Sequence, residues 1–426
     1  MVVRIMLIFM LLCGQLAVAA GPKAPATPRP QSGTDPSFRD FVATNAIPTP
    51  DLAQQLGIGW VRSDLPWPLL EPQNGQFQWA AADATISKIE GMGLGFLPMV
   101  GYTPAWAASI PNNSKSAPKN PQDWTNFVDQ LVARYSAAPY NLRYFQIWNE
   151  PTPQAGFFAG PPQQYIDQVY LPAAQVIRRH HCFVVFGGWP ISNPASQFEQ
   201  ILNYHNAWQW TDIVDVHYMS VAGFEQLSND WVRTGKCRGV WQSEMGYTTD
   251  PSYVPRNYLE ALYWMLENGW SDPGRYKFFW FTLSSGGSDA NNCLLKGGAL
   301  TTQGIRLKVL NSVMGAGPLS VLNGVATQPA LRPIPSGEAS TALGFRVGQN
   351  RAVVAVILVN DSSTQTVSVQ VPLPGRPASV QVVSSAGQAR PIQGQFGGGR
   401  LTVNIPRSDL QLDGTSLIGY LQIDGI

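Results

Sequence analysis

Short apolar runs that alternate with longer segments of helical periodicity constrain the fold of this chain most strongly. The runs are rich in β-branched and aromatic residues. We interpret seven of them as strands, at residues 59–63, 95–100, 144–149, 183–187, 213–217, 239–244 and 277–282. A weaker eighth strand is expected near residues 41–46. Nearly continuous apolar strands between helices are typical of a parallel sheet whose outer face is covered.

Helical patterns fill the gaps between these runs. They occur at residues 124–135, 165–179, 198–204 and 256–267. The number of strand–helix repeats and the length of the segment favour a closed (β/α)8 TIM barrel, at residues 38–316, over an open doubly wound sheet.

The pattern changes after a helical stretch at residues 303–313 and a Gly- and Pro-rich breaker at residues 315–318. Period-two alternation then appears at residues 351–359, 366–371, 379–383, 401–405 and 416–423, separated by turn residues. This predicts an antiparallel β-sandwich domain at residues 317–426, for which packing against the barrel is the expected role. A second domain also agrees with the total length of 426 residues.

The N-terminus has the features of a secretory signal peptide. Arg4 precedes an apolar run at residues 5–12, and Ala17 and Ala19 form a small-x-small cleavage site. We therefore expect residues 1–20 to be removed and the mature protein to be secreted, to the periplasm or the cell exterior. Residues 21–37 are rich in Pro and Ala and are predicted to be a disordered linker. No later stretch is apolar over the length that a membrane span needs.

The charge balance and the tryptophan content indicate which class of molecule this protein binds. The chain has 28 basic and 27 acidic residues, and only 13% of its residues are charged, which argues against nucleic acid or an anionic membrane as a partner. The 14 Trp residues suit a neutral ligand with flat faces, such as a carbohydrate. No metal-binding or phosphate-binding motif is evident, so we expect neither a metal nor an organic cofactor.

The cysteines give less information. Cys13 leaves with the signal peptide, and Cys182, Cys237 and Cys293 remain. Three cysteines allow one disulfide at most, and their spacing assigns no pair. Small buried hydrophobic side chains are the plainer interpretation, and the oligomeric state stays open.

Two carboxylates stand at the ends of predicted strands. The run at residues 144–148 ends in Asn149 and Glu150, and the run at residues 240–243 ends in Glu244. Catalytic residues of a TIM barrel lie at the carboxyl ends of its strands. Cleavage of a glycosidic bond needs two opposed carboxylates, one to protonate the leaving oxygen and one to attack the sugar or activate water.

At these motifs the sequence resembles clan A of the (β/α)8 glycoside hydrolases, which carry both catalytic glutamates on strands four and seven. The matching segments are residues 148–151, Trp-Asn-Glu-Pro, and residues 241–246, Trp-Gln-Ser-Glu-Met-Gly. Residues 60–77 and 102–107 are similar to the family 39-like group of β-xylosidases and biofilm-exopolysaccharide hydrolases. The resemblance covers approximately residues 38–316.

The resemblance implies a role for each matching residue. Glu150 would be the general acid/base and Glu244 the nucleophile of a retaining double displacement. Asn149 would contact the sugar 2-hydroxyl, Arg62 would keep Glu244 ionised, and Trp280 would form the floor of the reacting subsite. We count Tyr102, Trp106, Trp148 and Trp189 as further substrate contacts, with core packing as the alternative for each Trp.

One departure concerns the strand before the nucleophile. The clan usually has His and Tyr two residues apart there, whereas His217 and Tyr218 are adjacent here. Adjacent strand residues face opposite sides, so either a bulge brings both into the site or only one contributes. His217 is the safer choice of the two.

Two alternatives to an endo-acting polysaccharide hydrolase stay open. One is an exo-acting β-glycosidase such as a β-xylosidase, although apparently short loops favour an open groove. The other is a non-catalytic carbohydrate-binding scaffold, against which the retention of both acids argues.

Overall fold

The structure is a computed structural model of the chain, and it describes residues 36–190, 195–284, 292–315, 317–332 and 339–426. The predicted signal peptide and nearly all of the predicted linker lie outside these residues. Pro36 and Ser37 are an exception: the carbonyl of Pro36 accepts a hydrogen bond of 2.8 Å from the Leu319 amide, and Ser37 forms a β-bridge with Pro318. The last two residues of the predicted linker thus contact the start of the C-terminal part.

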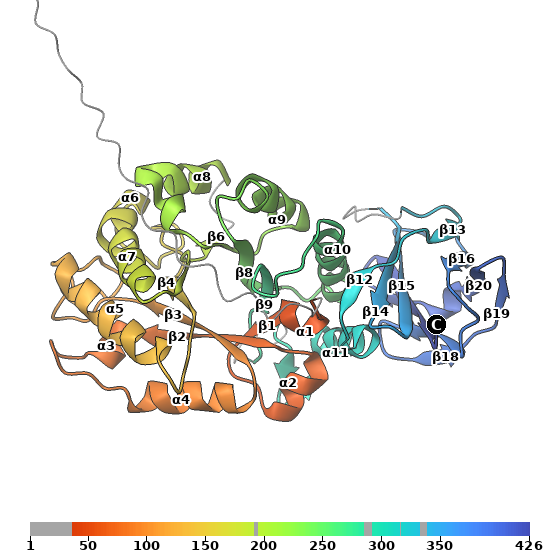
Figure 1. Ribbon diagram of the computed structural model, residues 1–426, viewed down its shortest axis with the longest axis horizontal. Coiled ribbons are helices and arrows are strands. Elements are labelled where there is room, and N and C mark those ends of the chain that lie inside the picture. The colour runs from red at the N-terminus through yellow and green to blue at the C-terminus, as the bar shows by residue number, and fades with distance from the viewer. Residues whose placement is uncertain (1–35, 191–194, 285–291, 316, 333–338) are drawn as a thin grey trace, which may run out of the picture.

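Within the described residues, eight parallel strands close into a barrel (Figure 1). They are β1 (Val42–Asn45), β2 (Trp60–Pro66), β3 (Gly95–Gly101), β4 (Tyr144–Ile147), β5 (Phe183–Val185), β7 (Ile213–His217), β8 (Gly239–Met245) and β9 (Tyr276–Trp280). Strand β1 pairs with both β2 and β9, and β5 pairs with β7, so the sheet has no open edge there. The short β6 (Trp189–Pro190) pairs beside β7. The predicted TIM barrel is confirmed, including its weak first strand.

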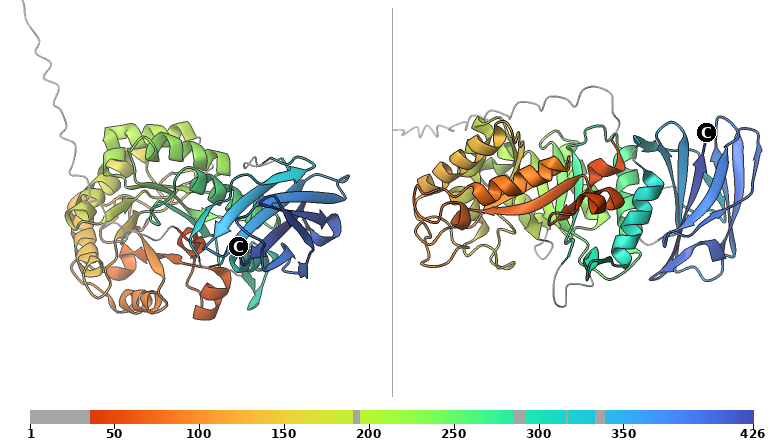
Figure 2. Two further views of the ribbon diagram at one scale, coloured as in Figure 1. Left: turned by 45° about the vertical axis from the view of Figure 1, so that its right-hand side comes forward. Right: turned by 90° about the horizontal axis from the view of Figure 1, so that it is seen from below.

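Helices cover the outside of the barrel (Figures 1 and 2). They are α1 (Phe38–Phe41), α2 (Pro50–Leu56), α3 (Trp67–Leu70), α4 (Ala80–Gly91), α5 (Pro121–Ser136), α6 (Pro162–Tyr165), η1 (Ile166–Tyr170), α7 (Leu171–Arg179), α8 (Ala195–Asn203), η2 (Tyr204–Trp210), α9 (Val221–Leu227), η3 (Ser228–Val232), α10 (Tyr253–Glu267) and α11 (Thr302–Met314). Helix α5 shows why they form. The Asn120 side chain caps it by accepting from the Gln122 amide, Pro121 opens its first turn, and its buried residues recur at helical spacing.

The barrel interior is built in layers. Side chains from all eight strands form an apolar layer in its lower part. They are Ala43, Trp60, Leu97, Tyr144, Phe183, Val185, Ile213, Trp241 and Phe279. Because side chains alternate along a strand, the residue two positions later points inward one layer higher. In that next layer five of the eight strands contribute polar residues: Asn45, Arg62, Gln146, Asp215 and Ser243. The sequence therefore fills the base of the barrel with apolar side chains and its carboxyl-terminal end with hydrogen-bonding ones.

The C-terminal part is the predicted antiparallel β-sandwich. One sheet has the order β12-β14-β15-β22-β17-β18, with β21 on β22, and the other has the order β13-β16-β20-β19. The bounds are β12 (Leu319–Val321), β13 (Ala326–Gln328), β14 (Thr341–Val347), β15 (Arg351–Val359), β16 (Thr366–Pro372), β17 (Ser379–Ser384), β18 (Ala389–Pro391), β19 (Gly394–Gly397), β20 (Arg400–Pro406), β21 (Gln411–Asp413) and β22 (Ser416–Asp424). The short hairpin β10 (Leu295–Lys296) and β11 (Ala299–Leu300) precedes α11, and the 3₁₀ turn η5 (Arg407–Asp409) precedes β21.

The larger sheet of the sandwich packs on the barrel through α10 and α11 (Figures 1 and 2). Strand β15 is apolar at nearly every position because both of its faces are buried. Val354 and Val356 face the other sheet, whereas Val353 and Ile357 belong to the same apolar cluster as the barrel. The sandwich is thus a packed extension of the barrel.

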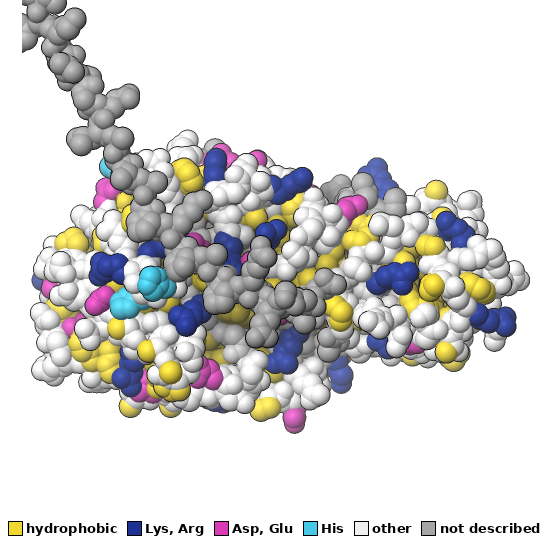
Figure 3. Space-filling view, in the orientation of Figure 1, with side chains coloured by type: hydrophobic (Ala, Val, Ile, Leu, Met, Phe, Trp, Pro, Cys, Tyr) yellow, Lys and Arg dark blue, Asp and Glu magenta, His cyan; other side chains and the backbone are white. Residues whose placement is uncertain are grey.

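Three further features concern the described residues. Cys182, Cys237 and Cys293 are buried and form no disulfide among the described residues, which agrees with their interpretation as small packed side chains. None of the described helices combines the length and apolar character that a membrane-spanning helix requires. On the face drawn in Figure 3, acidic and basic side chains are interspersed on a largely uncharged surface.

Candidate active site

The candidate nucleophile Glu244 lies near the carboxyl end of β8, in contact with a cation and a phenol. Its Oε1 accepts a hydrogen bond of 2.8 Å from Nη1 of Arg62, and its Oε2 accepts one of 3.0 Å from the Tyr218 hydroxyl. Burial opposes ionisation of this carboxyl, but His217, Arg62 and Tyr218 together outweigh burial and lower its pKa. The surroundings therefore hold Glu244 as a carboxylate.

A bulge in β8 brings Glu244 into the site. Val216 is opposite Gln242 and His217 is opposite Glu244, so Ser243 is an extra residue in β8 relative to β7. The same strand gains one residue relative to β9. A regular strand would place Ser243 and Glu244 on opposite faces, whereas the bulge lets both side chains join the polar layer.

Tyr218 reaches the site by a different route. It follows the end of β7 and has a φ of 53°, in the left-handed region that bulky residues rarely adopt. This turn directs its side chain to the same side as that of His217, and its hydroxyl reaches Glu244. The adjacency of His217 and Tyr218, which left the tyrosine in doubt, is resolved: both contribute.

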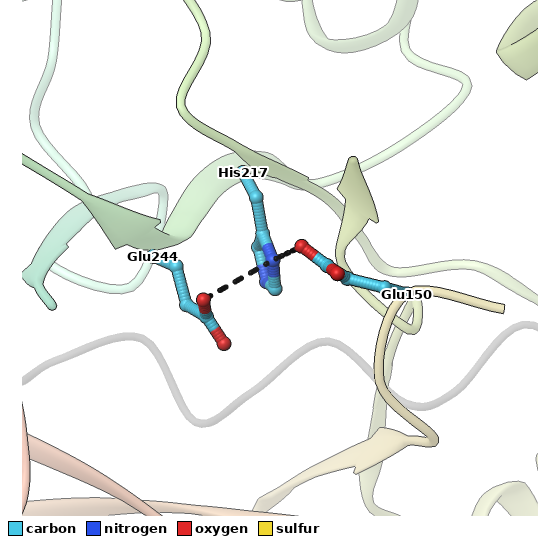
Figure 4. Close-up of side chains that lie close together, drawn as sticks. All are labelled: Glu150, His217 and Glu244. Atoms are coloured by element: carbon cyan, nitrogen blue, oxygen red, sulfur yellow. Dashed lines mark hydrogen bonds and ion pairs between the residues drawn. The ribbon is translucent and has the colours of Figure 1, made fainter. Parts of the chain in front are cut away.

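The second carboxylate, Glu150, lies across the mouth of the barrel from Glu244, with His217 between them (Figure 4). Nδ1 of His217 is 2.8 Å from Oε1 of Glu150 and 3.6 Å from Oε2 of Glu244. The closest atoms of the three side chains all lie within 4.8 Å of one another. The two carboxyl groups therefore face the same small space.

A buried network of polar side chains contacts His217 on the side that faces the barrel interior. Nε2 of His217 is 2.9 Å from the hydroxyl of Ser243, which donates to Asp215 over 2.7 Å. Asp215 also accepts hydrogen bonds from the Ser243 amide and from Nε2 of Gln146. Because the Ser243 hydroxyl donates to Asp215, it accepts from His217, so His217 carries a proton on Nε2.

The two titratable members of this network have shifted pKa values. Burial raises the pKa of Asp215 to about 6, although His217 and Ser243 oppose that rise. Burial alone would lower the pKa of His217, but the negative charge of Glu244 and the hydrogen bond to Glu150 raise it overall. A protonated imidazole can therefore donate through Nδ1 to Oε1 of Glu150.

Arg62 donates hydrogen bonds to three further side chains of the polar layer and its surroundings. Nη1 also donates to Asn45 over 2.9 Å, Nε donates to Gln146 over 2.7 Å, and Nη2 donates to Oδ1 of Asn149 over 2.5 Å. The last bond fixes the Asn149 amide so that its NH2 group is the end left to donate. Arg62 thus links Glu244 to the residue beside Glu150.

Backbone strain concentrates around this mouth. Tyr102, Trp148, Glu150 and Tyr218 are non-glycine residues with φ between 41° and 72°. Such conformations cost about 1–3 kcal/mol each and cluster at functional sites. Their position at the ends of β3, β4 and β7 marks this end of the barrel as the functional one.

The predicted aromatic contacts divide into two groups. Tyr102 is partly exposed, and the charges of Asp64, Arg62 and Glu244 act on its hydroxyl, which places it at the site. Trp106 is also partly exposed, packs edge-on to Trp67 and donates to the carbonyl of Glu71.

The other three predicted Trp contacts have no exposed face in this structure. Trp148 donates to the carbonyl of Phe157 and packs inside the barrel wall, and Trp189 stacks on Phe198 at 5.3 Å. Trp280 is likewise buried, with its ring directly over Gly246, where any Cβ would collide with it. These rings pack behind the site in this structure, and their contact with a sugar stays a prediction.

Sequence reasoning missed several residues of the site. Asn45, Gln146, Asp215 and Ser243 are polar residues at inward positions of apolar strands, and that contrast is the signal that could have found them. Tyr247, just after β8, was also missed. It is 52% exposed, and its ring centroid is 6.4 Å from that of Tyr218, so it is an aromatic surface beside the nucleophile.

Glu150, His217 and Glu244 are also the described residues whose atoms could together hold a metal ion. The donor set of two carboxylates and one imidazole suits a divalent cation. However, both nitrogens of His217 already have partners, and Arg62 already neutralises Glu244. The arrangement therefore fits a proton-transfer site better than a metal centre.

Comparison with known proteins identifies the fold. No protein-family model and no curated protein matches the sequence. Among solved structures, a family 39 glycoside hydrolase from Bacteroides cellulosilyticus WH2 is 15% identical, with a TM-score of 0.63 over 92% of this chain and 81% of that chain. A family 30 endoxylanase from Clostridium papyrosolvens C71 is 15% identical, with a TM-score of 0.59 over 92% and 98%. A glucosidase from Croceicoccus marinus is 12% identical, with a TM-score of 0.61 over 92% and 98%. This chain therefore has the fold that these glycoside hydrolases share.

Proposed function

We propose that this protein is a retaining glycoside hydrolase that cleaves β-glycosidic bonds of a poly- or oligosaccharide, with Glu150 as acid/base and Glu244 as nucleophile. The observation that carries the proposal is the approach of these two carboxylates to within 4.8 Å, between their closest oxygens, around His217. Retaining enzymes have carboxyl groups about 5–5.5 Å apart, whereas inverting enzymes need roughly 6.5–9.5 Å to admit a water molecule.

The surroundings of the two carboxylates support a division of roles. Arg62 and Tyr218 hold Glu244 ionised, as a nucleophile must be. Oε1 of Glu150 lies 2.8 Å from Nδ1 of His217, and a titratable neighbour at this distance suits a group that donates a proton in one step and accepts one in the next.

In the first step, Glu244 forms a bond to the anomeric carbon while the glycosidic oxygen leaves with the proton of Glu150. In the second step, water attacks the glycosyl-enzyme, transfers its proton to Glu150 and releases Glu244. Asn149, whose amide is oriented by Arg62, donates to the sugar 2-hydroxyl in both steps.

The environment of the site favours a substrate of several sugars. The exposed ring of Tyr247 lies beside Tyr218, which contacts Glu244, and there it can stack on a sugar next to the one that is cleaved. We therefore propose endo action, with export of the mature protein, directed by residues 1–20, bringing it to extracellular polysaccharide.

Hydrolysis assays test the proposal directly. Purified mature protein, Glu244→Gln and a surface control, Glu90→Gln on α4, would be incubated with xylan, β-glucans and bacterial exopolysaccharides, and reducing ends and product lengths measured. We expect oligosaccharides from the wild type and the control and none from Glu244→Gln. Monosaccharides alone would indicate an exo-glycosidase. Binding without any hydrolysis would indicate a non-catalytic scaffold.

A second measurement distinguishes the two glutamates. Proton NMR of early products should show retention of the β-anomer. With Glu150→Ala and an activated substrate, azide should restore turnover and give a β-glycosyl azide, because azide replaces water on the glycosyl-enzyme and needs no base. An inverted product in the wild type would contradict the retaining mechanism.

A further inference from the structure

Asp64 is a carboxylate in the mouth of the barrel to which the proposed chemistry assigns no role. Strand β2 is in regular register with β3 from Trp60 to Pro66, so its side chains alternate without interruption. Trp60 lies in the apolar layer and Arg62 in the polar layer. Asp64 therefore points to the same side one layer higher, above the Arg62–Glu244 ion pair, where it is exposed.

Within the described part of the chain, Asp64 has no hydrogen-bond or ion-pair partner. The donors of Arg62 are directed to Glu244, Asn45, Gln146 and Asn149. Although part of its side chain is open to solvent, the walls of the barrel mouth partly desolvate Asp64, and this desolvation raises its pKa. Nearby Arg62 opposes the rise, whereas the charge of Glu244 adds to it. The Asp64 carboxylate is thus held near other negative charge, accepts a hydrogen bond from no described residue and is open to solvent water.

A sugar that enters the mouth displaces this water. A carboxylate that loses its hydration without gaining hydrogen-bond donors is destabilised. The ligand therefore has to supply the donors. Sugar hydroxyls can do so, and so can the ammonium of an unacetylated amino sugar, whereas the carboxylate of a uronic acid would meet Asp64 and Glu244 with like charge.

We propose that Asp64 determines specificity: its carboxylate accepts hydrogen bonds from hydroxyl or ammonium donors of the sugar bound above Arg62, and it excludes uronic acids from that position. This inference rests on the proposed function of the same site, because it names the class of sugar that the site accepts. Asp64 contacts the substrate in this view but takes no part in bond cleavage.

Binding to an inactive variant tests the inference separately from catalysis. Glu150→Gln keeps the Arg62–Glu244 pair intact. Calorimetry would compare this variant with Glu150→Gln/Asp64→Asn, using cellohexaose as the neutral probe, chitosan hexasaccharide as the amine and a β-1,4-mannuronate hexasaccharide as the acid. Asp64→Asn keeps the size of the side chain and removes its charge. Asp51→Asn in the same background, on exposed α2, controls for loss of one surface charge.

We expect Asp64→Asn to weaken binding of the neutral or amino probe about 10-fold or more, since hydrogen bonds to a charged group are worth about 1.5–3 kcal/mol. Binding of the acid should strengthen. A loss for chitosan that far exceeds the loss for cellohexaose would identify the ammonium as the donor. Unchanged ratios among the probes, or no binding of any probe to Glu150→Gln, would overturn the inference.

The result is independent of the hydrolysis assay. Hydrolysis by the wild type with unchanged selectivity in Asp64→Asn would reject the inference and leave the proposed function in place. Binding that depends on Asp64 in a protein without hydrolytic activity would support the inference about Asp64 and reject the proposed function.

Discussion

The hydroxyl of Tyr218 donates a hydrogen bond of 3.0 Å to Oε2 of Glu244, although Tyr218 directly follows the inward-facing His217. Two local deviations make this possible: the extra residue Ser243 in β8 and the left-handed φ of Tyr218. The contact therefore depends on strained backbone, and strain of this kind clusters at functional sites.

Replacing Tyr218 by Phe should reduce kcat/KM by about 10- to 100-fold, the effect of losing a hydrogen bond to a charged group. That bond lowers the pKa of Glu244, so its removal raises the pKa, and the acidic limb of the pH–rate profile should move to higher pH. Tyr263→Phe, at the sandwich interface, is the matched control. An acidic limb that does not move would show that the hydroxyl does not act on the nucleophile.

His217 should make stability depend on pH. Glu244, Glu150 and Asp215 raise its pKa against burial and Arg62, so its protonation contributes stability below about pH 6.5, its ordinary value. That contribution is lost as pH rises through the raised pKa. Between these values the Tm of the wild type should fall more steeply than that of His217→Gln. Thermal scans from pH 6 to 9 check this, with the partly exposed His180→Gln as control; parallel curves for wild type and His217→Gln would contradict it.

The fold was predictable because burial on both faces makes the barrel strands nearly continuous apolar runs. The weakest of them, β1, is only four residues long, and it is placed by pairing with β2 and β9 rather than by its own sequence. Similarly, β14 was not predicted from alternation of polar and apolar residues. It is placed by its antiparallel pairing along β15.

The close approach of Glu150 and Glu244 was predictable, because both follow strand ends at the same end of the barrel. The direction of the Tyr218 side chain was not predictable, because it depends on backbone deviations. The exposure of the tryptophans was not predictable either, because it depends on tertiary packing. Trp148 and Trp280 follow strand ends as sugar platforms do, but their indoles donate to the carbonyls of Phe157 and Asn292 and are buried. Periodicity does not reveal such tertiary contacts.

Tyr247 should matter for long substrates and little for short ones. Stacking of a sugar on an exposed aromatic ring contributes about 1 kcal/mol, so Tyr247→Ala should raise KM several-fold for hexasaccharides while kcat changes less than twofold. Tyr247→Phe keeps the ring and should behave as the wild type. Kinetics on substrates of two to six sugars would reveal the effect, and equal changes at every length would place Tyr247 at the reacting sugar instead.

Metal removal should leave activity unchanged. Glu150, His217 and Glu244 lie within 4.8 Å of one another, but Arg62 and Ser243 already occupy bonding positions that a metal would need. Dialysis against EDTA should therefore cost no activity, whereas millimolar Zn²⁺ should inhibit by bridging the two carboxylates. Activity that is lost with EDTA and restored by a divalent cation would replace the two-glutamate mechanism with a metal-assisted one.

Arg306 on α11 and Asp413 on β21 join the barrel to the sandwich through a buried two-point ion pair, with N–O distances of 2.6 and 2.8 Å. The Ser385 hydroxyl also donates to Asp413. Asp413→Asn leaves the Arg306 charge buried without its partner, which should lower the free energy of unfolding by about 3–5 kcal/mol. Urea unfolding measures the loss, and activity of the folded fraction should persist because the pair lies outside the site.

The double variant Arg306→Met/Asp413→Leu removes both charges and should regain most of that stability. If it is as unstable as Asp413→Asn, the ion pair itself, rather than an uncompensated charge, holds the sandwich to the barrel.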